Sequence, residues 1–342
     1  MTEKGRKPNL TVVTYHYVRD LAHTPYPEIK ARRVEEFLGQ LDYLARHYTF
    51  CDPAQVVAAC YGGDSLPSNP CLLTFDDGIA DCFRVVLPIL QQRGIRGLFF
   101  VPAQTTELRQ VLDVHKIHFI LAVTRDFDRL LAEIKQLALP RLAAAPAAED
   151  PFTVALVPSR FDTPVVNRIK RVLQRRFPEP VRTQITDELF RRYVTADEEA
   201  FARDLYISVE QLQAMVAAGM MIGGHGYGHP WLEDEPPARQ QEEIHRTREF
   251  LERVYGHLPR HWAMAYPYGS YNRHTIDLLE AAGCGMAFTA RVGLTTDLSK
   301  PLELCRLDTN DLPLAAEGPL SPWTFEVCRE SSTVDAAKER SG

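Results

Sequence analysis

The sequence lacks any hydrophobic run long enough to cross a membrane, since no stretch of 18 apolar residues occurs in the chain. The apolar run near the amino terminus, LTVVTY, is short and fits a buried strand better than a signal peptide. A basic excess is also lacking, because 39 Lys and Arg stand against 45 Asp and Glu, for a net charge of -6. We therefore expect a cytoplasmic protein with no integral membrane segment and no nucleic-acid partner.

Cysteine is sparse, and none of the seven cysteines forms a CxxC pair. An odd and scattered set of this kind argues against a disulfide framework and against a structural zinc knuckle. The length of 342 residues suits one α/β barrel of roughly 250 residues with an insertion. No sequence feature indicates the oligomeric state.

Short apolar runs with the length and composition of buried strands recur along the chain. They cover residues 10–15, 71–75, 97–101, 220–223, 262–266 and 285–289. Amphipathic stretches separate several of them, and Ser208 with Gln211 forms a capping box that opens a helix closed by Gly219. The alternation predicts an α/β fold, either a βα barrel or an open sheet.

Residues 105–204 break this alternation. The segment is rich in Leu, Arg, Ala and Glu, is mostly helical in period, and contains an Ala/Pro-rich stretch near 143–151. We predict a helical insertion that covers the active-site face, because it follows a strand directly and the loops after strands carry the active sites of α/β barrels. The barrel is then expected over 8–104 and 205–315, and a disordered tail over 330–342.

Chemically reactive side chains follow the ends of predicted strands. His16 comes after LTVVTY, Asp76 and Asp77 after CLLTF, and His225 after MIGG. The carboxyl ends of parallel strands open on one face of a barrel, so these residues are expected to share one pocket. The adjacent carboxylates of LTFDDG suit separate roles, one as a metal ligand and one as a base, with a solvated Asp-Asp-Gly turn as the alternative.

The segment GGHGYGHPWL places His225 and His229 four residues apart among glycines, with a proline after the second. This composition argues against a helical HExxH site and favours a shaped loop that presents both rings to one ion. Two histidines and one carboxylate leave coordination positions open for water and substrate, as a catalytic metal site requires.

Three motifs together, TFDDG, the HxxxH of GGHGYGHPWL, and AYPYGSYN, resemble in order and separation those of the NodB-homology polysaccharide deacetylases, carbohydrate esterase family 4. The resemblance covers roughly residues 8–105 and 205–310. It implies a deformed (β/α)7 barrel, one divalent metal ion that is usually zinc, and hydrolysis of N-acetyl groups on sugars. Because the sequence shows no secretion signal, we expect the partner to be an acetamido sugar or an intracellular sugar-containing precursor of a surface polysaccharide or glycoconjugate.

The resemblance also assigns roles to single residues. Asp76 matches the family's catalytic base, and Asp77, His225 and His229 match its metal ligands. Tyr268 matches the residue whose backbone N–H holds the tetrahedral oxyanion, with an aromatic Tyr-Pro-Tyr-Gly packing turn as the alternative.

Two positions depart from the family's pattern. Ala265 stands where the family often has an arginine that orients the base, and no histidine follows His274 as the usual general acid. TYHYV resembles the YHxV segment of the PgaB and IcaB branch, whose motifs are circularly permuted, and so assigns His16 as the acid; a structural histidine is the alternative. Arg306 is a candidate partner of Asp76, with a surface arginine as the alternative.

The insertion holds His115, Lys116 and His118 in LDVHKIHFIL. They are either substrate-recognising groups or the basic start of an amphipathic helix, and they are not assigned to the catalytic set. Two other functions stay open for the whole chain: a metal-dependent amidohydrolase of a formamide or ureide, and a catalytically inactive sugar-binding module. The intact DDG and both histidines of the HxxxH segment count against the inactive module.

Overall fold

The computed structural model describes residues 10–63, 65–142, 151–153 and 162–329. Its chain divides into two compact units. The described parts of Met1–Arg19, Arg32–Leu108 and Asp204–Gly342 form the first, and those of Asp20–Ala31 and Arg109–Arg203 form the second. The predicted tail over 330–342 and most of the Ala/Pro-rich stretch lie outside the described residues.

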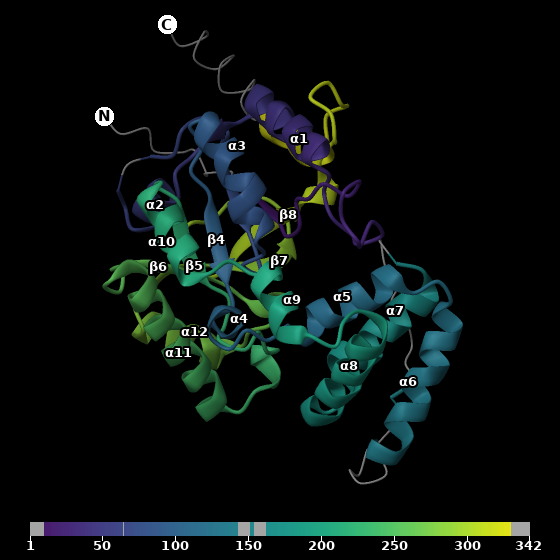
Figure 1. Ribbon diagram of the computed structural model, residues 1–342. Coiled ribbons are helices and arrows are strands. Elements are labelled where there is room, and N and C mark those ends of the chain that lie inside the picture. Colours follow the sequence, from purple (N-terminus) through teal and green to yellow (C-terminus); the bar gives the residue numbers. More distant parts are fainter. Residues whose placement is uncertain (1–9, 64, 143–150, 154–161, 330–342) are drawn as a thin grey trace, which may run out of the picture. The chain divides into compact units, whose positions relative to one another are not determined.

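The first unit is built on parallel strands that close into a barrel. The strands are β1 (Thr11–Tyr15), β2 (Thr49–Phe50), β3 (Pro70–Phe75), β4 (Leu98–Val101), β5 (Met221–Gly224), β6 (Trp262–Ala265), β7 (Cys284–Val292) and β8 (Leu304–Asp308). Hydrogen-bonded neighbours follow the order β1-β8-β7-β6-β5-β4-β3, and β3 pairs back onto β1, so these strands form a ring (Figure 1). The short β2 pairs only with the start of β3. The predicted deformed (β/α)7 barrel is confirmed, and the open sheet is excluded.

Alternate residues of each strand face two different apolar clusters. Val12, Leu72 and Phe100 belong to one cluster, whereas Val13 and Leu73 belong to another that also contains Phe37 of helix α1 (Val34–His47). The first cluster therefore fills the barrel, and the second lies between strands and helices. Because both faces of the strands are buried, their sequences are continuous apolar runs rather than alternating ones.

Helices cover the outside of the barrel (Figure 1). Besides α1 they are α2 (Pro53–Cys60), α3 (Leu87–Gln92), α4 (Ala103–Glu107), α10 (Val209–Ala217), α11 (Pro237–Tyr255) and α12 (Arg273–Ala281). Helices α10 and α11 contact β5, and α12 contacts β7. The predicted capping box opens α10, where the Ser208 backbone N–H donates to Gln211 Oε1 at 2.9 Å and Gln211 N–H donates to Ser208 Oγ at 3.3 Å. Gly219 follows with a φ of 85°.

The second unit is helical in its described residues. Its helices are α5 (Asp113–Val123), α6 (Phe127–Leu142), α7 (Pro164–Arg171), α8 (Glu179–Tyr193) and α9 (Glu198–Leu205), the last of which runs into the first unit. Residues 20–31, from the long connection between β1 and α1, join this unit: the Tyr26 ring lies 4.9 Å from that of Phe119, and Lys30 Nζ lies 2.6 Å from Asp162 Oδ1. No sequence pattern indicated this association.

Two members of the basic cluster of the insertion, His115 and Lys116, are part of the interior of the second unit. His115 is fully buried, and Lys116 is only 4% exposed. Lys116 Nζ contacts Glu198 Oε1 at 2.9 Å and also hydrogen-bonds to Asp187. Burial lowers the pKa of Lys116, but these two carboxylates outweigh it and raise the pKa above its ordinary value. Lys116 therefore stabilises helix packing.

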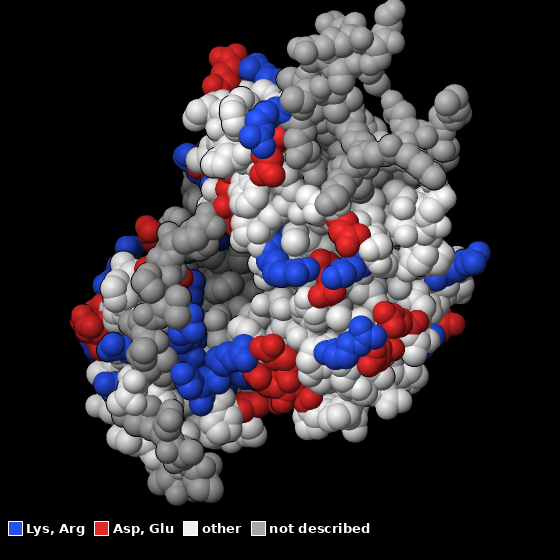
Figure 2. Space-filling model, turned by 180° about the vertical axis from the view of Figure 1, so that it is seen from behind, with Lys and Arg blue, Asp and Glu red and all other residues white. Residues whose placement is uncertain are grey.

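None of the described helices is long and apolar enough to span a membrane. On the face of the molecule in Figure 2, acidic and basic side chains lie beside one another. Surface ion pairs of this kind include Arg84 with Asp204 at 2.8 Å and Arg273 with Asp277 at 2.7 Å. Exposed pairs contribute about 0–1 kcal/mol each, so they matter little for stability.

Candidate active site

The barrel brings four of the predicted residues together at the carboxyl ends of its strands. Asp76 and Asp77 directly follow β3, and His225 directly follows β5. His229 lies on the loop beyond β5. All four side chains are buried, with exposures of 2%, 4%, 2% and 8% in chain order. Burial of carboxylate and imidazole groups at this depth costs free energy unless each group has a polar or charged partner.

Asp77, His225 and His229 form a possible metal site. Asp77 Oδ1 lies 3.4 Å from His225 Nε2 and 3.5 Å from His229 Nε2, and the three donor atoms lie within 4.8 Å of one another. Two ligands bound at about 2.1 Å to a tetrahedral ion lie roughly 3.4 Å apart. The donor types and their separations therefore fit a divalent cation.

The second ring nitrogen of His225 fixes the orientation of this ligand. His225 Nδ1 donates to the backbone carbonyl of Ala265 at 2.7 Å, which leaves Nε2 facing Asp77. Burial lowers the pKa of His225, but the carboxylates of Asp77 and Asp76 outweigh it and raise the pKa above its ordinary value. A cation at this position would take the place of that proton.

Three site residues adopt left-handed backbone conformations. The φ angles of Asp77, His229 and Tyr268 are 74°, 62° and 57°. Only two other non-glycine residues of the described chain, Asn69 and Arg109, have positive φ. Such conformations cost on the order of 1–3 kcal/mol each and tend to cluster at functional sites. Three such conformations in one cluster indicate a site whose geometry reduces the stability of the fold.

Asp76 has different partners from Asp77. Its Oδ1 accepts from Arg306 Nη1 at 2.8 Å, and Arg306 is in turn held by Thr14 Oγ1 and the Thr289 carbonyl, each at 3.1 Å. Burial raises the pKa of Asp76, but the charges of Arg306, His225 and His16 lower it below its ordinary value. The expected pairing of Arg306 with Asp76 is confirmed, and the alternative of a surface arginine is excluded because Arg306 is buried.

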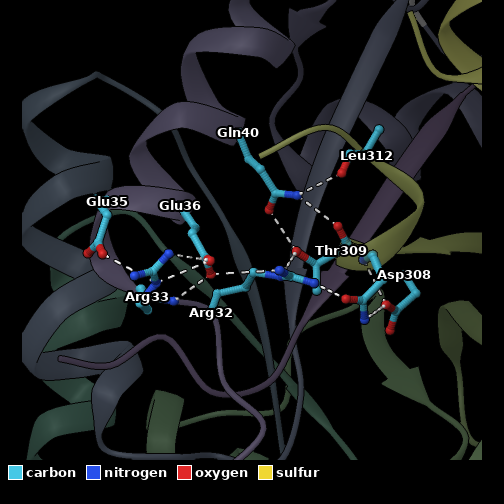
Figure 3. Close-up of polar contacts among 9 residues, drawn as sticks. Arg32, Arg33, Glu35, Glu36, Gln40, Asp308, Thr309 and Leu312 are labelled. Atoms are coloured by element: carbon cyan, nitrogen blue, oxygen red, sulfur yellow. Dashed lines mark hydrogen bonds and ion pairs between the residues drawn. The ribbon is translucent and has the colours of Figure 1, made fainter. Parts of the chain in front are cut away.

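The end of the strand that carries Arg306 is fixed by a hydrogen-bond network (Figure 3). The buried Gln40 of α1 donates to the Thr309 carbonyl at 2.7 Å and accepts from Thr309 Oγ1 at 2.7 Å. Arg32 Nε donates to the same hydroxyl at 3.1 Å. Because Thr309 directly follows β8, these bonds hold the strand end just beyond Arg306.

His16 and Tyr268 lie at the edge of this cluster. His16 Nε2 is 3.9 Å from Asp76 Oδ2, and its side chain is 42% exposed. The Tyr268 ring lies 4.6 Å from the His229 ring and stacks on Trp231 at 4.3 Å with an interplanar angle of 4°. Trp231 was not predicted from the sequence, although it stands in the same HPWL segment as His229.

A cavity of about 660 Å³ opens at the other end of the barrel, before β6, β7 and β8. Its lining includes Tyr61, His261, Lys300 and Glu303 but none of the candidate catalytic residues. It therefore has no part in the chemistry derived from the strand ends.

The sequence pattern of the polysaccharide deacetylase family matches residues 186–287. The matched segment contains His225, His229 and Tyr268. Asp76 and Asp77 lie upstream of it, beyond most of the helical insertion. The insertion separates the two halves of the motif set. No curated protein matches the chain.

Three solved structures share the fold. The Streptococcus pyogenes deacetylase PplD, solved in complex with acetate, is 17% identical with a TM-score of 0.56, and the alignment covers 94% of this chain and 97% of that one. IcaB from Ammonifex degensii is 22% identical with a TM-score of 0.52, covering 88% and 92%. The BpsB deacetylase domain from Bordetella bronchiseptica is 16% identical with a TM-score of 0.51, covering 87% and 95%.

At these identities the three likenesses establish the fold alone. Placement in the permuted PgaB and IcaB branch on the strength of TYHYV stays a prediction. The closed barrel and the matched segment, residues 186–287, are thus what the chain has in common with the polysaccharide deacetylases.

Proposed function

We propose that the protein is a metal-dependent hydrolase that removes the N-acetyl group from an amino sugar. The observation that carries the proposal is the different surroundings of two neighbouring carboxylates. Asp77 faces two imidazole nitrogens at 3.4 and 3.5 Å, whereas Asp76 is held through Oδ1 by Arg306 at 2.8 Å. One carboxylate belongs to the metal donor set, and the other keeps Oδ2 for proton transfer.

Asp77, His225 and His229 are the residues that would hold the ion. We propose zinc, because two imidazoles and one carboxylate are a known donor set of catalytic zinc sites that leaves a position for water or substrate. When bound, the ion supplies positive charge that polarises an amide carbonyl and makes water more acidic.

The remaining residues of the site move protons and hold charge. Asp76 accepts the proton of the attacking water, since its lowered pKa keeps it ionised and Arg306 fixes its direction. The backbone N–H of Tyr268 donates to the developing oxyanion, a contribution on the order of 3 kcal/mol for one donor. His16 protonates the departing amine, which is otherwise a poor leaving group, and its exposed ring can recover a proton from solvent.

An aromatic pair beside the metal ligands supports a sugar as substrate. Trp231 and Tyr268 stack on each other, and the Tyr268 ring contacts His229. Aromatic side chains next to a few fixed polar groups are typical of sites that bind small molecules, and their faces suit the C–H faces of a sugar ring. We propose a precursor of a surface polysaccharide or glycoconjugate as the substrate class.

The proposal is tested by metal analysis of the purified protein, followed by an acetate-release screen on single and linked acetamido sugars, with formamides and ureides in parallel. The expected result is stoichiometric zinc and release of acetate that a chelator abolishes and added zinc restores. Turnover of a formamide or ureide alone would assign the protein to the non-sugar amidohydrolases. Stoichiometric metal without turnover of any amide would favour the inactive sugar-binding module.

A further inference from the structure

The two histidine ligands lie on a loop whose own residues form no helix or strand. Only Gly226, Tyr227 and Gly228 separate them. Contacts from the segment after β4 hold one side of the loop: Ala103 N–H donates to the Gly226 carbonyl at 3.3 Å, and Gln104 N–H donates to the Tyr227 carbonyl at 3.0 Å. The backbone N–H groups of Tyr227 and Gly228, in the same loop, also need hydrogen-bond acceptors.

A single buried carboxylate accepts both of them. Glu243 Oε2, from helix α11, accepts from Tyr227 N–H at 2.7 Å and from Gly228 N–H at 2.9 Å. The residue is 1% exposed, and its nearest cation is Arg239, with Nη2 at 3.8 Å from Oε1. Burial raises the pKa of Glu243, an effect that the two backbone N–H groups and Arg239 partly offset. Burial of a carboxylate costs free energy unless it accepts hydrogen bonds. The two bonds from the loop therefore compensate for the burial of Glu243.

The position of the carboxylate constrains the loop closely. A Cβ atom added at Gly226 would lie 3.4 Å from Glu243 Oε2, and one at Gly228 would lie 3.4 Å from Glu243 Oε1. The next residue, His229, has a φ of 62°. This left-handed conformation is unfavourable for a non-glycine residue unless surrounding contacts hold it. Bonds to two successive peptide groups fix the backbone immediately before this ligand.

We propose that Glu243 is a positioning residue that preorganises the loop carrying His225 and His229 and thereby sets the affinity of the site for its divalent metal. The inference rests on the proposed function only in taking these histidines as ligands. Loss of groups that orient metal ligands typically weakens metal affinity by 10–100-fold. Removal of the Glu243 carboxylate is expected to have an effect of this size although Glu243 does not touch the metal donor atoms.

The test compares Glu243→Leu with Glu242→Leu, its neighbour on the same helix. Glu242 is exposed and pairs with Arg239 at 3.3 Å, and among the described residues the N–H groups of Tyr227 and Gly228 donate to Glu243 rather than to Glu242. The measurement is the dissociation constant for zinc, by competition with a chelator, in folded protein well below the unfolding temperature. We expect about 10–100-fold weaker binding for Glu243→Leu and an unchanged constant for Glu242→Leu. Equal zinc affinity of Glu243→Leu and the parent would overturn the proposal.

Glu243→Gln is the conservative rescue, because its amide oxygen can accept from both N–H groups, and its zinc affinity should stay near that of the parent. A purely stabilising role would lower the unfolding temperature of Glu243→Leu without changing its zinc constant.

If Glu243→Leu does not fold, hydrogen exchange in the zinc-free parent decides. The amides of Tyr227 and Gly228 should be protected there, and rapid exchange at both would show that Glu243 does not preorganise the loop. Failure of the proposed function is a separate result, namely a parent that binds zinc tightly but releases no acetate.

Discussion

Buried and partly buried charges occur in both units of the molecule, but they are arranged differently. In the helical unit, Lys116 lies against Asp187 and Glu198, and Asp113 accepts from Arg182. Each of these charges meets groups of the opposite sign within the unit.

At the barrel's strand ends, two carboxylates stand next to each other, and Asp77 and two histidine nitrogens point toward one position. The left-handed φ angles of Asp77, His229 and Tyr268 also lie here. Burial of charge alone therefore does not identify a functional site. Convergence of donor atoms on one point, with backbone strain, does so.

The largest expected effect comes from removing one of the converging donors. His225→Ala or His229→Ala should each lose the metal and with it all turnover, because a single carboxylate and one imidazole hold zinc poorly. Metal content after desalting and acetate release are the two measurements. The matched control is His274→Ala, an exposed histidine of α12, which should keep both. A His229→Ala protein that binds metal as tightly as the parent would show that His229 is not a metal ligand.

A smaller effect is expected at the edge of the site. His16→Ala should keep its metal and lose roughly 10²–10⁴ in kcat on an ordinary acetamide, the range expected for a general acid. The loss should be much smaller on an activated anilide, whose leaving group needs little protonation. Equal losses on both substrates would indicate a positioning role, and no loss on either would return His16 to a structural role.

The smallest effect on activity is expected from the paired charges of the helical unit. Lys116→Met should reduce the free energy of unfolding by about 1–3 kcal/mol, because the partly buried carboxylates of Asp187 and Glu198 lose their hydrogen-bond donor. Metal content and kcat should stay at the parent values. Urea unfolding and zinc titration of the same sample check this. A weaker zinc affinity would show that the two kinds of buried charge are not independent.

The barrel was largely predictable because its strands are buried on both faces. Continuous apolar runs such as CLLTF and WAMA identify them without tertiary information. The strand β8 was less distinct, because its sequence LCRLD places Arg306 inside the strand. The association of residues 20–31 with the helical unit could not be predicted, since it depends on contacts between distant segments such as Tyr26 and Phe119.

The site was predictable where chemistry sits directly at a strand end, as with Asp76, Asp77 and His225. Glu243 was not, because QQEEIHR resembles any charged helix surface and only tertiary packing distinguishes the buried Glu243 from the exposed Glu242. Trp231 was missed for the same reason, since its stacking on Tyr268 joins two separate loops.

The two adjacent carboxylates, Asp76 and Asp77, are assigned different roles, which metal content and acetate release in Asp76→Asn beside Asp77→Ala distinguish. Asp76→Asn should keep stoichiometric metal but lose turnover, because Asp76 moves a proton and binds no ion. Asp77→Ala should lose the metal itself. An Asp76→Asn protein without metal, or an Asp77→Ala protein that retains metal at the parent's affinity, would contradict the assignment.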